Sequence, residues 1–245
     1  MGNRSELPGI GCESAPAAGA EWSGFLELDL AGTVHSVIEC RENGPLIAAV
    51  GVLWIKPSDL VMDVTYGQGN FWTVLRPERF IAHDLAVDGV DFRQLPEADG
   101  SVDVIVFDPP YIPQGGRETS TTPDFLNRYG LVTVPKTTEE LEELIAAGMK
   151  ECARVLAPKG RLLVKCMDYI NGARYRQGRH HAVQTAHELG LRQVDEFVHY
   201  SGTGPQPERE SQYHSRRTHT FLCVFQAPAR KRPNLSSVPV PDFDE

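Results

Sequence analysis

The feature that most constrains the fold is a short apolar run that ends in a rigid polar loop. Residues 102–107 are almost continuously apolar, which is typical of a strand buried on both faces of a parallel sheet. The tetrapeptide Asp-Pro-Pro-Tyr follows at 108–111. Its two prolines stiffen the chain because they fix φ and remove two backbone donors. Since α/β proteins bind ligands at the carboxyl ends of parallel strands, we expect this loop to clamp a planar polar group.

A glycine-rich loop follows an earlier apolar run. Residues 60–64 predict the first core strand, and the chain then continues through Thr65 to Gly67 and Gly69. Two glycines one residue apart permit a tight turn and a close approach of backbone to a ligand. Alone, such a pair predicts only a turn, but ahead of Asp-Pro-Pro-Tyr it becomes a strong signal for a binding loop.

The next predicted strand also ends in a carboxylate. Residues 80–83 predict a short strand, and Asp84 comes directly after it. A carboxylate at this place can accept hydrogen bonds from both hydroxyls of a ribose. Asp88 is the alternative acceptor.

Together these motifs resemble the S-adenosylmethionine-dependent methyltransferases that modify exocyclic amino groups, mostly of adenine or cytosine in DNA. The resemblance covers about residues 45–226 and is specific in the glycine loop and in Asp-Pro-Pro-Tyr. It implies an α/β, Rossmann-like class I methyltransferase fold. Such a fold has a mostly parallel seven-stranded sheet with a terminal antiparallel strand pair, and helices on both faces. Because the glycine loop precedes Asp-Pro-Pro-Tyr without a large insertion, the chain does not resemble the permuted members of the family.

The resemblance also implies roles for the loop at 108–111. Asp108 and the carbonyl of Pro109 accept N–H bonds from the target amine, Pro110 belongs to the same rigid motif, and Tyr111 stacks on a base flipped out of its helix. An exocyclic amine is a poor nucleophile because its lone pair is delocalised into the ring. Two acceptors draw this nitrogen toward tetrahedral geometry and stabilise the positive charge that develops as it attacks the methyl group.

S-adenosylmethionine is the cofactor that the resemblance implies. Asp91-Phe92 corresponds to an acid–aromatic pair that flanks the adenine ring, although Asp91 could equally be a simple turn residue. Where the family commonly has Pro-Phe after the first Asp, this chain has Val64-Thr65, which leaves open the side chain that covers the cofactor. The expected cofactor contacts are Asp63, Thr65, Gly67, Gly69, Asn70, Asp84, Asp91 and Phe92.

The charge of the chain is distributed unevenly. The net charge of −9 at first argues against nucleic acid as a partner. However, residues 1–153 carry 10 Lys and Arg against 24 Asp and Glu, whereas residues 154–232 carry 14 against 6. The basic part predicts a face that contacts phosphates, with ordinary segregation of surface charge as the alternative. The candidate contacts to nucleic acid are Arg117, Arg174, Arg176, Arg179, Arg216 and Arg217.

Length and composition predict one domain over residues 22–228, between flexible tails at 1–21 and 229–245, and the resemblance implies that this domain is the methyltransferase. Segments 112–135 and 171–217 are the candidate substrate-recognition segments within it.

The five cysteines are widely spaced and include no Cys-x-x-Cys, which argues against a zinc site or disulfides and for a cytoplasmic protein. No apolar run is long enough to span a membrane, and the paired histidines at 180–181 have no third metal ligand nearby. The oligomeric state stays open.

Periodicity and turn residues predict the remaining elements. Residues 45–55 predict a short helix, and residues 138–156 predict a helix capped by Thr137 or Thr138. The link that follows the predicted strand at 80–83 is so short that the helix usual at this place in the family should be reduced to a turn. Further predictions are a hairpin around Ala31-Gly32, strands over 161–167, 191–200 and 218–225, and a helix over 182–189.

The leading hypothesis is a DNA amino-methyltransferase. Asp at the first position of the tetrapeptide favours adenine N6 over cytosine N4, and the absence of a Pro-Cys nucleophile argues against methylation at carbon 5. The first alternative is methylation of guanine N2 in RNA, because those enzymes also use Asp-Pro-Pro-Tyr. The second is a non-catalytic cofactor-binding module on the same fold, against which the intact tetrapeptide argues.

Overall fold

A seven-stranded sheet forms the middle layer of the computed structural model, which describes residues 33–113, 135–201 and 213–229. The strand order is β1-β8-β9-β5-β4-β2-β3. Strand β9 is antiparallel to both of its neighbours, and every other pairing in this sheet is parallel. The predicted mostly parallel sheet with an antiparallel pair is therefore confirmed. The strands are β1 (Val37–Glu39), β2 (Leu60–Asp63), β3 (Arg79–Ala82), β4 (Val102–Phe107), β5 (Leu156–Cys166), β8 (Arg192–Tyr200) and β9 (His219–Gln226).

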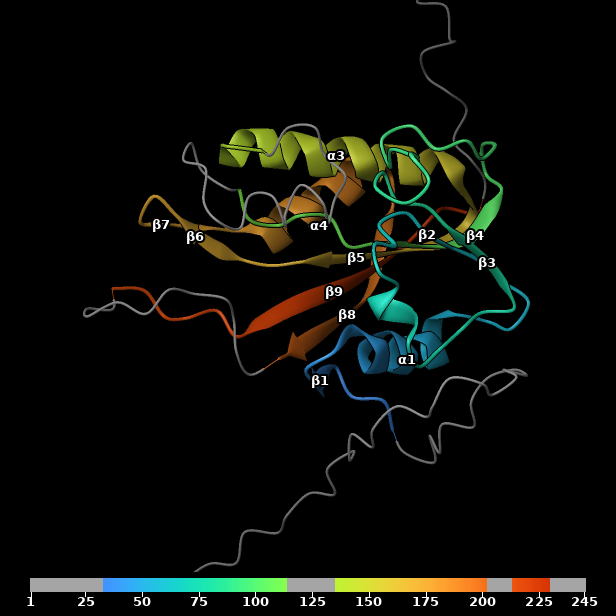
Figure 1. Ribbon diagram of the computed structural model, residues 1–245, viewed down its shortest axis with the longest axis horizontal. Helices are drawn as coiled ribbons and strands as arrows, with labels where there is room; N and C mark the ends of the chain where they lie inside the picture. The colour runs from blue at the N-terminus through green and yellow to red at the C-terminus, as the bar shows by residue number, and fades with distance from the viewer. Residues whose placement is uncertain (1–32, 114–134, 202–212, 230–245) are drawn as a thin grey trace, which may run out of the picture.

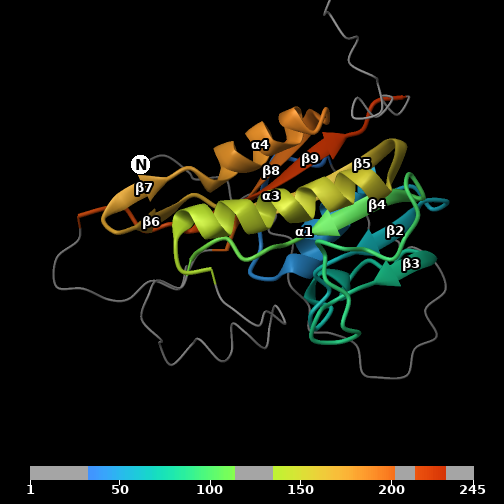
Figure 2. The ribbon, with the colours of Figure 1, turned by 90° about the horizontal axis from the view of Figure 1, so that it is seen from above.

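Helices cover both faces of this sheet (Figure 1). Helices α3 (Thr138–Val155) and α4 (Gly178–Glu188) lie on one face, and α1 (Asn43–Trp54) lies on the other. Viewed from above in Figure 2, α3 and α4 lie over the sheet and run roughly along its strands. As predicted, Thr137 caps α3, where its hydroxyl accepts a bond of 3.1 Å from the Glu140 N–H. Among the described residues, no helix is both long and apolar enough to span a bilayer.

The apolar run in β4 is buried on both faces because two separate cores meet at this strand. Ile105 and Phe107 belong to the core beneath α3, whereas Val104 and Val106 belong to the core around α1. All four side chains are fully buried. Alternation along a strand sends neighbouring side chains to opposite faces, so a central strand between two helical layers must be apolar throughout.

The six strand ranges predicted from the sequence leave the seventh strand of the sheet unassigned. No strand forms between β3 and β4, so β3 lies at one edge, and the short β1 completes the opposite edge beside β8. The link at 83–101 contains no helix, which agrees with the expected reduction to a turn. The predicted hairpin around Ala31-Gly32, both tails except residue 229 of the second, and most of segment 112–135 lie outside the described residues.

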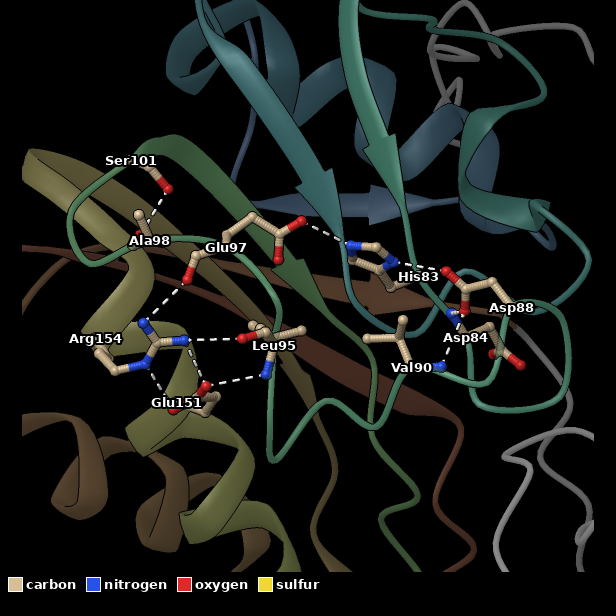
Figure 3. A network of polar contacts seen from close by, with 10 residues as sticks. All are labelled: His83, Asp84, Asp88, Val90, Leu95, Glu97, Ala98, Ser101, Glu151 and Arg154. Atoms are coloured by element: carbon tan, nitrogen blue, oxygen red, sulfur yellow. Dashed lines mark hydrogen bonds and ion pairs between the residues drawn. The ribbon is translucent and has the colours of Figure 1, made fainter.

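Side-chain contacts, and not pairing with the sheet, fix the position of the link at residues 83–101 (Figure 3). His83 lies between the carboxylates of Asp88 and Glu97, at 2.6 and 2.8 Å. Burial lowers the pKa of His83, but the bonds to its two carboxylates outweigh this effect, so the pKa is raised above its usual value. From α3, Arg154 donates to the carbonyls of Leu95 and Glu97, each at 3.0 Å. The link is thus fixed by side chains at both of its ends.

Two further differences concern β5 and the segment beyond it. Strand β5 begins at Leu156, and Pro158 to Gly160 form an irregularity within it, where Lys159 has a φ of 63° and the register to β4 shifts. The basic segment contains a small hairpin of β6 (Tyr169–Asn171) and β7 (Arg174–Arg176). Its two turn residues have positive φ, as tight hairpin turns require.

Candidate active site

The glycine loop and the Asp-Pro-Pro-Tyr loop follow neighbouring strands. Strand β2 lies between β3 and β4 in the sheet, so the chain leaves β2 toward one side and returns for β4 on the other. In open α/β sheets such a reversal of strand order leaves a crevice at the carboxyl ends of the strands. Both sequence motifs therefore lie at the place where this fold binds ligands.

Thr65 joins the two loops directly. The backbone N–H of Asp108 donates to the hydroxyl oxygen of Thr65 over 2.8 Å. The N–H of Thr65 in turn donates to the Asp63 carboxylate over 2.9 Å. The residue at which the chain departs from the family pattern is thus the one that fixes the position of Asp108.

The glycines adopt the backbone conformation that their spacing predicts. Gly67 and Gly69 have φ values of 52° and 74°, in the left-handed region that only glycine enters without strain. A β-carbon on Gly69 would also lie 2.7 Å from the Tyr66 hydroxyl. The N–H of Gly67 donates to Asp84 over 2.9 Å, so the carboxylate after β3 lies against the glycine loop. Asp88, the alternative acceptor, pairs with His83 instead.

Asp63 supports the glycine loop from within the core. Its side chain is 1% exposed and accepts a bond of 2.6 Å from the indole N–H of Trp72. Burial raises the pKa of Asp63 to about 7, and the charge of Asp108 contributes to the rise, while bonds from Trp72 and Thr65 oppose it. Asp63 therefore acts on the site by ordering the loop.

Asp91 and Phe92 each contact another side chain of the protein. Arg93 pairs with Asp91 at 2.5 Å and thereby lowers the pKa of this carboxyl. Phe92 is 5% exposed, and its ring packs edge-on against Phe107 at 5.1 Å. The positions of both side chains are thus explained by contacts within the protein, without a cofactor. Asn70 is exposed at the start of the short helix Asn70–Trp72.

Sequence reasoning missed Lys165, a lysine near the end of β5 that is 5% exposed. Its ammonium donates to Asn43 Oδ1 over 2.7 Å and lies 3.9 Å from Asp108 Oδ2. It also lies 5.5 Å from the ring centre of Phe71. The available signal was a lone charge within the apolar run Leu-Leu-Val-Lys-Cys, which places a cation in a buried strand.

A mostly apolar hollow adjoins the tetrapeptide on the α3 side of the sheet. Pro109 and Tyr111 form part of its wall, and Tyr169 begins the hairpin that extends from it. His181 lies in the wall as well, with Nε2 3.0 Å from the Glu142 carbonyl. Among the described residues, no group of His, Cys, Asp or Glu has the arrangement of a metal site. The hollow is lined by Pro109, Tyr111, Leu141, Glu142, Ile145, Val164, Lys165, Cys166, Met167, Tyr169, Gly178, His181 and Ala182.

The candidate arginines differ in exposure and in whether their charge is paired within the protein. Arg174 is exposed on the hairpin, and the Arg217 guanidinium lies 5.2 Å from the ring centre of Tyr175 beside it. The charge of Arg179 is paired with Glu196 at 2.5 Å. Arg216 is exposed, Arg176 is half-buried in the hairpin, and Arg117 lies outside the described residues.

No known family model and no curated protein matches the chain. Among solved structures, a putative DNA modification methylase from Thermus thermophilus in complex with S-adenosyl-L-methionine is 14% identical, with a TM-score of 0.38 over 72% of this chain and 59% of that chain. The cytosine-N4-specific PvuII DNA methyltransferase is 13% identical, with a TM-score of 0.40 over 58% and 48%. A SAM-dependent methyltransferase from Methanosarcina mazei is 10% identical, with a TM-score of 0.44 over 74% and 98%. The chain thus spans about half the length of the two DNA methylases.

Proposed function

We propose that this protein is an S-adenosylmethionine-dependent methyltransferase that acts on an exocyclic amino nitrogen of a nucleobase. Adenine N6 in DNA is the favoured target. The observation that carries the proposal is the bond between the Asp108 N–H and the Thr65 hydroxyl. It joins a glycine loop to an acceptor loop at the ligand-binding edge of the sheet, which is the arrangement that methyl transfer to an amine requires.

The residues around the glycine loop fit the cofactor. Positive φ at Gly67 and Gly69 lets the backbone approach a bound molecule closely. Each oxygen of Asp84 accepts one backbone N–H, from Gly67 and from Ala86, and a carboxylate oxygen can accept a second bond, so Asp84 can also hold a ribose. We assign the cofactor contacts to this loop, to Asn70 and to Asp84. Asp63 acts by ordering the loop.

The tetrapeptide supplies the groups that activate the amine. The Asp108 carboxylate and the Pro109 carbonyl accept the two N–H bonds and stabilise the charge that develops on nitrogen. Tyr111, at the wall of the apolar hollow, stacks on the base. The cofactor, when bound, supplies the methyl group. Because these acceptors act on charge that appears only in the transition state, they raise kcat more than they tighten binding.

The hairpin and the segment 213–217 form the proposed nucleic-acid contact. Tyrosine and arginine side chains suit base stacking and phosphate binding. The half-buried Arg217 lies over the ring of the exposed Tyr175, which follows the exposed Arg174 in the hairpin. The hairpin follows β5 directly, so the contact begins beside the hollow that Tyr111 lines. Arg179 is left out of this contact because Glu196 pairs with it.

The test uses labelled S-adenosylmethionine with unmethylated genomic DNA and, separately, with total RNA. The products are digested to nucleosides and separated. We expect label in N6-methyladenine from DNA with the wild type and none with Asp108→Ala, while Glu143→Ala, a change on the exposed face of α3, retains activity. Label in N4-methylcytosine would correct the target base, and label only in RNA guanosine would correct the substrate. No label in either nucleic acid, with cofactor binding intact, would refute the proposal.

A further inference from the structure

We propose that Lys165 is a positioning residue that holds the Asp108 carboxylate ionised and oriented for the incoming amine. This role rests on the proposed function, because it concerns the group that would accept the N–H bonds of the substrate. The ion pair itself is a property of the fold and can be tested without any activity.

The burial of Lys165 is the first observation. The ammonium group belongs to a residue that is 5% exposed, and the strand residues before it, Leu163 and Val164, are fully buried and apolar. An ammonium that leaves water loses its hydration, which is strongly unfavourable unless partners compensate for it. An apolar side chain at this place would avoid that cost, so the contacts of the charge must account for its presence.

The second observation is that the three contacts of the Lys165 ammonium differ in kind. Asn43 accepts a full hydrogen bond of 2.7 Å from the ammonium, and the Phe71 ring offers its face to the charge. The distance of 3.9 Å to Asp108 Oδ2 is within range of charge attraction but beyond a hydrogen bond. The ammonium therefore stabilises the negative charge on Asp108 and does not itself occupy an acceptor position on that carboxylate.

The third observation is the set of titratable groups around the pair. Asp63 at the end of β2 is a second carboxyl whose charge interacts with that of Asp108. His199 on β8 is a third titratable group, and burial together with the charge of Lys165 lowers the pKa of this histidine, which favours its neutral form. Two neighbouring carboxylates resist simultaneous ionisation. Within the described part of the chain, Lys165 forms an ion pair with Asp108, and this favours Asp108 as the carboxyl of the two that stays ionised.

The test compares two substitutions on the same strand. Lys165→Met keeps much of the side-chain volume and removes the charge. The matched control is Arg161→Met, because Arg161 is also a nearly buried cation on β5, four residues before Lys165, and is paired with a different carboxylate, Asp59, at 2.8 Å. We expect Lys165→Met to lower kcat at neutral pH by tenfold or more. The acidic limb of its pH–rate profile should move upward by about one to three pH units, the range for an opposite charge next to a carboxylate. Arg161→Met should retain the wild-type pH profile even where it lowers stability.

A second measurement is independent of turnover. The carboxyl carbon of Asp108, identified by its loss in Asp108→Asn, is followed by ¹³C NMR in a pH titration without substrate. We expect it to titrate at higher pH in Lys165→Met than in the wild type and in Arg161→Met. An unchanged titration would overturn the inference. So would weaker cofactor binding with an unmoved pH profile, because Lys165 would then be a cofactor contact. A wild type without methyl transfer would refute the proposed function and leave the NMR result to decide on the ion pair.

Discussion

Replacing Thr65 with valine tests the junction between the two loops. Valine has nearly the same shape as threonine, so the change removes the hydroxyl and keeps the packing. In the structure this hydroxyl accepts the Asp108 N–H over 2.8 Å and lies 3.4 Å from the Asp63 carboxylate. A buried donor left without its partner costs about 1–3 kcal/mol. Because Thr65 is only half-buried, water can replace part of the bond, and we expect about 1–2 kcal/mol.

The expected effect on catalysis follows from the same quantity. Without this bond the Asp108 loop can sample other positions, and it must return to the observed one before the reaction. A free-energy cost of about 1.4 kcal/mol for this return lowers kcat about tenfold. Urea unfolding and single-turnover methyl transfer measure the two effects, and cofactor titration shows that binding is retained. Thr65→Ser is the matched control, since it keeps the hydroxyl and should recover most of kcat. A Thr65→Val enzyme with wild-type kcat would refute the coupling of the loops.

Three further predictions follow from individual contacts. His83 has a raised pKa because its two carboxylate partners outweigh burial, so its contribution to stability is complete below pH ~6.5 and is lost as the pH rises through the raised value. Thermal unfolding from pH 5 to 9 should show this slope, and His83→Gln should remove it. Gly69→Ala should weaken cofactor binding and lower the free energy of unfolding by about 1–3 kcal/mol, because φ is 74°; calorimetry that finds wild-type affinity would contradict the assignment of the glycine loop. Changing Arg174 and Arg217 to Ala should reduce the slope of log K against log salt by about two, whereas Arg179→Ala, which removes an internally paired charge, should leave the slope unchanged.

The parts of the fold that could be predicted from the sequence are those whose cause is local. The continuous apolar run of β4 requires two covering layers, and the structure supplies them. The cap at Thr137 and the positive φ of Gly67 and Gly69 depend on neighbouring residues only. The place of Asp84 after β3 follows from the rule that strand ends meet at one edge of a sheet.

The parts that could not be predicted depend on partners that are distant in the chain. Asp91 and Phe92 match a family pattern, but in the structure Arg93 pairs with the Asp91 carboxylate and Phe107 packs against the Phe92 ring. Lys165 was missed because its hydrogen-bond partner Asn43 comes from the start of α1, which only the folded sheet brings to β5. A resemblance transfers positions along the chain, but it does not transfer the neighbours that occupy those side chains.

The two carboxyls of the site illustrate why neighbours decide chemistry. In the sequence, Asp63 and Asp108 are equivalent, since each ends an apolar strand and each opens a loop with a motif. In the structure, Asp63 is enclosed by Trp72 and the core, which raises its pKa to about 7, while Asp108 faces Lys165 at 3.9 Å. Near neutral pH the first carboxyl is therefore poised to carry a proton, and we infer that Lys165 holds the second as an anion. A carboxylate accepts N–H bonds more strongly than a carboxylic acid does, so under this inference the buried lysine on β5 determines which of the two strand ends is the better acceptor for an amine.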